Sequence, residues 1–158
     1  TSIGISVFLM QKFCHFASKN IYKWPNKYYY TDIGLRNARL NYRQYDPGHI
    51  MENIIYNELL CRGYSVDVGV VTDRTGGANA QKEIDFVVND ADKKIYIQSA
   101  FQMDTDKKES SELASLILTK DFFKKIIVRM DIPHNFYDDN GIFHCNLIDL
   151  LLGRVELF

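Results

Sequence analysis

Two neighbouring segments, KEIDFVVN (82–89) and KIYIQSA (94–100), decide the fold. Both are rich in β-branched and aromatic residues, which favour strands, and the polar run NDADKK (89–94) joins them. Two strands this close in sequence pair as an antiparallel hairpin. We therefore predict two adjacent strands with a short turn between them.

Side chains in a strand alternate between its two faces. On the first strand, alternation predicts that Ile84, Phe86 and Val88 share one face and that Asp85 lies on the other. On the second strand, Gln98 and Ala100 share a face. Folding the hairpin is therefore expected to bring Asp85, Gln98 and position 100 onto one surface.

The segments around the hairpin predict an α/β fold. Asp46-Pro47-Gly48 is a helix start and Gly63 a left-handed helix end, so a helix is expected over about 47–62. The other expected elements are a strand at 64–72, a loop at 73–80, a helix at 105–118, a strand at 124–130, a loop at 133–141, and a strand and terminal helix within 141–152. This order predicts a sandwich of three layers, with a mixed central sheet flanked by helices.

Residues 1–26 are expected to form an N-terminal extension, and residues 27–158 one domain. Within the extension, residues 5–18 predict a helix or an apolar arm, because their periodicity is weak. The chain starts at Thr1 rather than at a methionine, which predicts that it is part of a longer protein.

Residues 19–43 mix aromatic and basic side chains and contain a single acid, Asp32. Either Thr31 or Asp32 is expected to cap a short helix that runs to about residue 40. Basic side chains neutralise phosphates and aromatic rings stack on bases, so this segment is a candidate nucleic-acid surface. Its candidate contact residues are Lys19, Lys23, Trp24, Lys27, Arg36, Arg39 and Arg43. The alternative is a packed extension with lysine and arginine at its rim.

The composition of the chain excludes some classes of function and favours others. The formal net charge of −1 excludes a strongly basic nucleic-acid binder, although it allows a local basic face. No run of about 18 apolar residues exists, so no membrane contact is expected. The three cysteines lie far apart, without the spacing of a zinc site, which favours reduced thiols and a cytoplasmic protein.

The acids of the hairpin and the preceding helix suggest a phosphodiester site. Hydrolysis of a phosphodiester uses carboxylates that hold Mg²⁺, and it gains from a lysine that stabilises developing charge. Asp85 offers one carboxylate, and the helix offers Glu52 and Glu58. The second strand offers Gln98 and Ala100 instead of an acid and a lysine. Glutamine is a weaker ligand for a hard cation, and alanine supplies no chemistry.

Three alternatives remain open. Another lysine, Lys82 or Lys94, can replace the missing one and give an active nuclease. Glu58 falls among apolar residues on the helical wheel, so it can be the buried acid, paired with Arg62. The acids can also be solvated surface residues without a functional role.

Several stretches together resemble the C-terminal domain of unknown function of a large family of prokaryotic AAA+ ATP-binding proteins. The stretches are KYYYTDIGLRNA (27–38), GHIMENIIYNELLCRGYSVDVG (48–69), EIDFVV (83–88), IYIQSA (95–100) and GIFHCNLIDLLL (141–152). The resemblance implies a restriction-endonuclease-like fold with a PD-(D/E)XK nuclease core. It also implies that Glu52 and Asp85 stand at the metal-binding acids of that core. Gln98 stands at the acid and Ala100 at the lysine of its third strand.

The resemblance therefore implies a degenerate nuclease domain that binds DNA or a protein partner and does not cut. An active Mg²⁺- or Mn²⁺-dependent nuclease is the second expectation, and a regulatory or assembly domain for its own ATPase module is the third. No G-x-x-x-x-G-K-[S/T] loop occurs in the chain, so ATP is expected only in an upstream module. Mg²⁺ is expected only if the carboxylate site is functional.

Overall fold

The computed structural model describes residues 8–11, 13–15, 27–43, 45–73 and 80–158. Its main sheet has seven strands and is mixed, with both parallel and antiparallel neighbours. From one edge to the other the strands are β2 (Phe13–His15), β4 (Ser65–Asp73), β5 (Ala80–Asp90), β6 (Lys93–Ala100), β7 (Lys124–Arg129), β9 (Phe143–Asn146) and β8 (Phe136–Tyr137).

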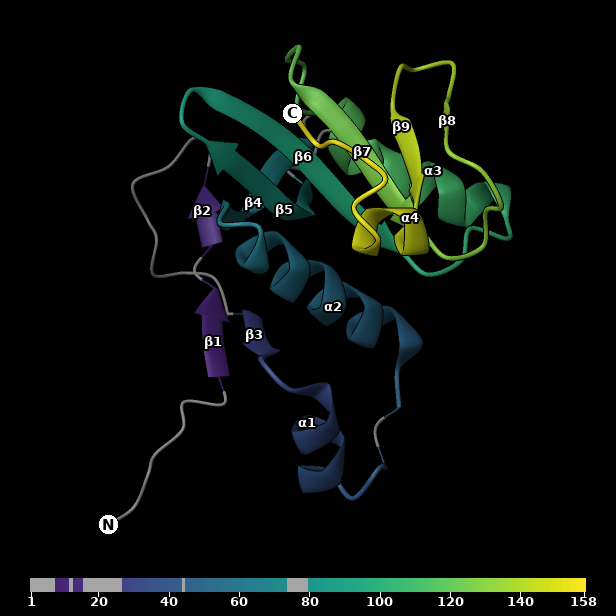
Figure 1. Cartoon of the computed structure of the whole chain (residues 1–158). Helices are drawn as coiled ribbons and strands as arrows, with labels where there is room; N and C mark the ends of the chain where they lie inside the picture. Colours follow the sequence, from purple (N-terminus) through teal and green to yellow (C-terminus); the bar gives the residue numbers. More distant parts are fainter. Residues whose placement is uncertain (1–7, 12, 16–26, 44, 74–79) are drawn as a thin grey trace.

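Helices cover both faces of this sheet (Figure 1). Helices α2 (Pro47–Cys61) and α4 (Leu147–Leu151) pack on one face, and α3 (Asp106–Ile117) packs on the other. Two apolar clusters fill the two interfaces, and burial of large side chains in them is the main stabilising contribution. The predicted α/β class with a mixed sheet between helical layers is confirmed.

Local signals placed most elements correctly. Helix α1 (Ile33–Arg39) begins after Asp32, whose side chain accepts a hydrogen bond from Leu35 N. Helix α2 begins in the same way after Asp46, and Gly63 follows its end with φ of +84°. The hairpin of β5 and β6 is antiparallel, as predicted.

Of the two alternatives for residues 5–18, the helix is wrong where the structure describes this segment. Two short strands occupy that region, β1 (Phe8–Gln11) and β2, which pair with β3 (Lys27–Tyr30) and β4 respectively. Partners distant in sequence satisfy the backbone of these strands, so the local periodicity carried no signal of them. The two-residue strand β8, within the region expected to be a loop, was also missed, for the same reason.

A bulge in β5 changes which way its side chains face. Asp67 pairs with Val87, but Gly69 pairs with Ile84, so two β5 residues lie opposite the single residue between them on β4. Ile84 consequently packs in the α3-side cluster, while Phe86 packs in the α2-side cluster. The prediction that Ile84 and Phe86 share a face is therefore wrong.

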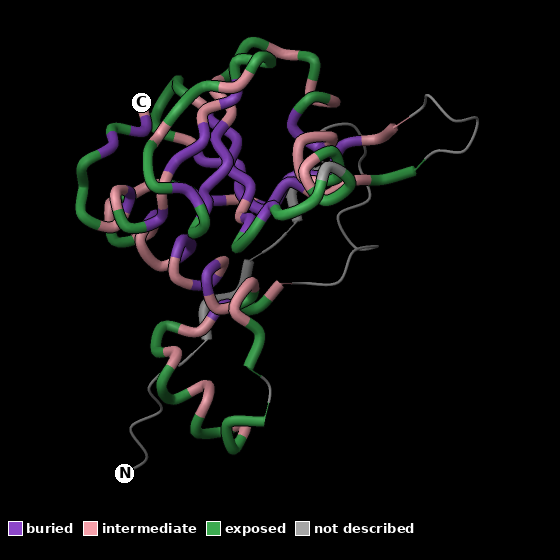
Figure 2. Tube along the Cα trace, turned by 90° about the vertical axis from the view of Figure 1, so that its right-hand side faces the viewer, coloured by how far each residue is buried: buried purple, intermediate pink, exposed green. Residues whose placement is uncertain are grey.

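Helix α1 projects away from the sheet (Figure 1). It has no buried residue, and the tube in Figure 2 is mostly exposed along it and the turn that follows. Tyr42 and Tyr45 are 74% and 75% exposed in this turn. We call residues 33–43 and 45 the α1 arm.

Candidate functional site

An open cavity of about 620 Å³ lies where β3, α1, α2 and β5 meet. Its walls combine acids, bases and tyrosines. The lining residues are Lys27, Tyr28, Tyr29, Tyr30, Arg36, Leu40, His49, Glu52, Asn53, Glu83 and Asp85. We call this cavity the acid cleft, after its three carboxylates.

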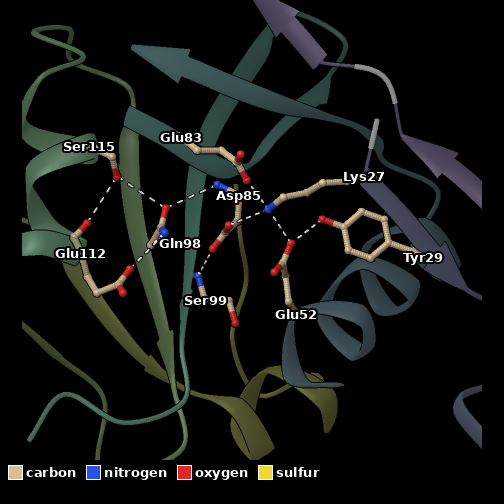
Figure 3. A network of polar contacts seen from close by, with 9 residues as sticks. All are labelled: Lys27, Tyr29, Glu52, Glu83, Asp85, Gln98, Ser99, Glu112 and Ser115. Atoms are coloured by element: carbon tan, nitrogen blue, oxygen red, sulfur yellow. Dashed lines mark hydrogen bonds and ion pairs between the residues drawn. The ribbon is translucent and has the colours of Figure 1, made fainter. Parts of the chain in front are cut away.

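The ammonium of Lys27 lies between the three carboxylates (Figure 3). Its Nζ is 2.7 Å from Glu52 Oε1 and 3.1 Å from Asp85 Oδ1, and it also forms an ion pair with Glu83. Burial lowers the pKa of Lys27, but the charges of Asp85 and Glu52 outweigh burial and raise the pKa above its ordinary value. Lys27 is therefore a charged, internal counter-ion of the cluster.

Glu52 also accepts a hydrogen bond from the Tyr29 hydroxyl, at 2.5 Å from Oε1. The Tyr29 ring stacks on Tyr56 of α2, with centroids 4.1 Å apart, so packing fixes the hydroxyl next to the carboxylate. Burial and the neighbouring charge of Glu52 raise the pKa of Tyr29, which keeps it a hydrogen-bond donor.

The bulge in β5 places Asp85 at the floor of the acid cleft. Its Oδ2 accepts a hydrogen bond from Ser99 N at 2.9 Å, while Oδ1 faces Lys27. Burial raises the pKa of Asp85 to about 7; the negative charge of Glu52 adds to this rise, and Lys27 partly offsets it. Burial and Glu52 thus favour the protonated form of Asp85 more than in a solvated aspartate.

Gln98 points the other way, toward α3 (Figure 3). Its Nε2 donates to Glu112 Oε2 at 3.1 Å, and its Oε1 lies 3.5 Å from Ser115 Oγ. Gln98 meets Asp85 only through the backbone, because Asp85 N donates to Gln98 Oε1 at 3.3 Å. The expected single surface is therefore not formed: the Asp85 carboxylate faces β3 and α2, whereas the Gln98 amide faces α3.

Ala100 lies in the apolar cluster on the α3 side and is 3% exposed. The lysine that reaches the acids comes instead from β3. Lys94 lies over the Phe123 ring, 5.4 Å from its centroid, and among the described residues Lys82 forms no ion pair. Lys27, and neither Lys82 nor Lys94, is therefore the lysine beside the acids.

Of the two helix glutamates, Glu52 joins the acid cleft. Glu58 forms the expected pair with Arg62, at 2.8 Å, and its side chain is 25% exposed. Arg62 also donates to the Leu150 carbonyl, so this pair ties α2 to α4. The position of Glu58 is that of a structural residue.

The basic residues of segment 19–43 are divided between several places. Lys19, Lys23 and Trp24 lie outside the described residues. Lys27 forms ion pairs with the acids of the cleft, and Arg36 lines the acid cleft. Arg39 and Arg43 are exposed on the α1 arm, without an ion pair to any described residue.

The arrangement does not fit the Mg²⁺ that the nuclease resemblance implies. The facing oxygens of Glu52 and Asp85 already accept from Lys27, Tyr29 and Ser99. Donors of the chain itself thus stand where a metal ion would bind.

Sequence reasoning assigned Lys27 to a nucleic-acid surface and did not single out Tyr29 or Glu83 for this cluster. A signal existed, since Lys27 and Tyr29 are two residues apart in an aromatic, strand-like run and so share a face. What that face meets depends on Asp85, 58 residues away, and no local pattern indicates this contact.

Comparison with known proteins gives an uncharacterized relative and no fold assignment. A protein of Haemophilus influenzae described as "Uncharacterized protein" is 36% identical over 110 residues, which is 70% of this chain and 25% of that protein. The chain therefore spans about a quarter of the length of the relative it matches. No family model and no solved structure matches the chain. Among the described residues, every helix is too short or too polar to cross a membrane.

Proposed function

We propose that this chain is a non-catalytic, restriction-endonuclease-like domain that binds DNA. In this proposal it is the C-terminal module of a longer cytoplasmic AAA+ ATP-binding protein, whose ATP site lies upstream. The relative from Haemophilus, four times the matched length, leaves room for such a module.

The non-catalytic part of the proposal rests on one observation. The strand that should supply an acid and a lysine supplies Gln98, which is bound to Glu112, and Ala100, which is buried. Glu52 and Asp85 therefore have no third-strand partner with which to hold a metal ion and activate water. The scaffold of a cleavage site is kept while its chemistry is lost.

The α1 arm supports the binding part of the proposal. Arg39 and Arg43 can neutralise phosphates, and the exposed rings of Tyr42 and Tyr45 can stack on bases. Asp32, the single acid between residues 27 and 45, accepts the hydrogen bond that caps α1. The arm is thus locally basic in a chain of net charge −1.

Two assays test the proposal together. The chain is incubated with supercoiled and single-stranded DNA in Mg²⁺ or Mn²⁺, and no cleavage is expected. Binding of a labelled oligonucleotide is then followed by anisotropy at low salt. Replacing Arg39 and Arg43 by alanine is expected to weaken binding at least tenfold. The double variant of Lys93 and Lys107, which removes the same charge elsewhere on the surface, is the matched control and is expected to stay within about twofold.

A second candidate function is favoured by Lys27. Its Nζ lies 3.1 Å from Asp85, close enough to act as the lysine of an active nuclease. Cleavage by the wild type in Mn²⁺ that disappears in both Asp85→Ala and Lys27→Met would establish this candidate and refute the non-catalytic proposal.

A third candidate is a domain that regulates its own ATPase module. Absence of DNA binding at micromolar protein, together with capture of the separately expressed upstream region in a pull-down, would favour this function over DNA binding.

A further inference from the structure

Three carboxylates share the acid cleft, and two of them are largely shielded from water. The side chains of Glu52 and Asp85 are 15% and 11% exposed, whereas Glu83 is 38% exposed at the rim. Like charges this close and this buried are relieved either by a proton on one of them or by a cation between them, which can be a metal ion or a basic side chain. The identity of that cation decides what the cleft can bind.

Hydrogen bonds of this chain occupy the oxygens that a cation would use. Glu52 Oε1 accepts from both Lys27 and Tyr29, at 2.7 and 2.5 Å. The two oxygens of Asp85 accept from Lys27 and from Ser99 N, at 3.1 and 2.9 Å. A divalent ion would have to displace Lys27 before it could reach either acid.

The strand that carries Lys27 is held in place independently of this ion cluster. Asn53 of α2 exchanges two hydrogen bonds with the backbone of Tyr30, and the Tyr29 ring stacks on Tyr56. Strand β3 is therefore docked on α2 by contacts of the residues that follow the lysine. The ammonium reaches the cleft as part of a fixed strand, not as a mobile surface side chain.

We propose that the Lys27 ammonium is the resident cation of the acid cleft and takes the place of a divalent metal ion. While β3 is docked, the cleft binds no Mg²⁺ or Mn²⁺, and the chain folds without metal. Removing the ammonium leaves three carboxylates without a counter-ion, and such a cluster takes up a hard divalent cation. The inference concerns the cleft of the proposed function, but it does not depend on DNA binding by the α1 arm.

Metal binding to the whole chain tests this directly. Wild type, Lys27→Met, Lys27→Arg and the control Lys82→Met are titrated with MnCl₂ by calorimetry, and Tm is measured in EDTA and in millimolar Mn²⁺. Lys82 is the matched control because it lies on β5 beside Glu83 but pairs with no described acid. Methionine keeps the length of the lysine stem and removes its charge.

Wild type, Lys27→Arg and Lys82→Met are expected to bind no Mn²⁺ up to about 1 mM and to have the same Tm in EDTA and in Mn²⁺. Lys27→Met is expected to melt lower in EDTA and to gain roughly 3 °C or more in Mn²⁺. Should it fail to fold in EDTA, recovery of its folded far-UV spectrum on adding Mn²⁺ is the supporting result.

Two results would overturn the inference. One is Mn²⁺ binding by the wild type below about 1 mM. The other is a Lys27→Met protein that neither binds Mn²⁺ nor recovers its fold with it. These metal-binding and melting measurements are independent of the DNA assays. A negative result here would not contradict the DNA-binding proposal, and absence of DNA binding would not contradict the role of Lys27 as resident cation.

Discussion

The side chain of Asn53 forms two hydrogen bonds with the backbone of Tyr30, as a neighbouring strand would. Tyr30 N donates to Asn53 Oδ1 at 2.8 Å, and Asn53 Nδ2 donates to Tyr30 O at 2.7 Å. Asn53 is 4% exposed, so these bonds are protected from water. A helix side chain therefore anchors β3, and with it the two β3 residues that reach Glu52.

Replacement of Asn53 by alanine should loosen this anchor. It leaves the Tyr30 N–H without its partner in a partly buried place, which should lower the free energy of unfolding by about 2 kcal/mol. Urea unfolding gives this number, and faster amide exchange at Tyr30 reports the loosening locally. Asn57→Ala is the comparison, because Asn57 also donates to Tyr30 O, and it should cost about half as much. Equal losses in the two variants would contradict the anchoring role.

Replacement of Tyr29 by phenylalanine separates packing from hydrogen bonding. The ring can keep its stack on Tyr56, while the bond to Glu52 Oε1 is lost. Because that acceptor is charged and shielded, we expect a loss of about 1.5–3 kcal/mol in the free energy of unfolding, measured in urea. Tyr28→Phe is the control, because the neighbouring residue Tyr28 is 57% exposed, and it should change the free energy of unfolding by less than about 0.5 kcal/mol.

The local parts of the fold could be predicted from the sequence, and the site could be predicted only in part. Asp32, Asp46 and Gly63 mark helix ends because capping is a contact between residues two to four positions apart. The resemblance implied that Glu52 and Asp85 converge, and the structure places both in one cleft.

The rest could not be predicted, because it depends on contacts distant in sequence. The bulge in β5 arises from pairing with β4 and turns Asp85 toward α2, against simple alternation. Lys27 looked like a surface base because nothing near it in sequence indicates that three acids surround it. The charge of a residue is visible in a sequence, but its partner is not.

Gly69 is expected to be needed for the bulge that positions Asp85. A Cβ at Gly69 would lie 2.8 Å from Val87 Cγ2 and 3.2 Å from Ile84 Cβ, both in the adjacent strand. Gly69→Ala should therefore lower the free energy of unfolding by about 1–3 kcal/mol. Gly34→Ala, in the exposed helix α1, is the control: a Cβ there would lie 3.0 Å from the movable side-chain oxygen Oδ1 of Asp32 and near no backbone atom outside its own helix, so the change should cost less than about 1 kcal/mol in the same urea titration.

Introducing the acid and the lysine of the nuclease pattern on β6 should not create a nuclease. In Gln98→Glu a second carboxylate replaces the amide that donates to Glu112, and Ala100→Lys places a charge in the α3-side apolar cluster. The double variant should lose more than about 3 kcal/mol of stability, or fail to fold, and it should not cleave DNA in Mn²⁺. Cleavage by a folded double variant would show that position 98 can turn toward Asp85 and that our account of the cleft is wrong.

The raised pKa of Asp85 predicts a particular dependence of stability on pH. Its pKa is about 7 in the folded chain against 3.8 in the unfolded chain, so the folded state holds the extra proton between these values. The free energy of unfolding contributed by Asp85 is therefore fully present below about pH 4 and falls as the pH rises through about 7. Asp85→Asn should remove this fall, since the amide oxygen can still accept from Ser99 N and carries no charge to bury.

The effect of Asp85 has to be measured as a difference between wild type and a variant. The reason is that His144 changes the free energy of unfolding over an overlapping pH range, with the opposite sign. Burial and Arg129 lower the pKa of His144, so its contribution to stability grows as the pH rises toward 6.5. Urea midpoints of wild type and Asp85→Asn are therefore compared at each pH from about 4.5 to 8.5, roughly half a unit apart, so that the part due to His144 cancels. The variant should gain stability relative to wild type as the pH rises, with most of the change between about pH 5 and 7. Parallel curves over this range would show that Asp85 is ionised throughout, and that Lys27 balances the cluster more fully than its three ion pairs indicate.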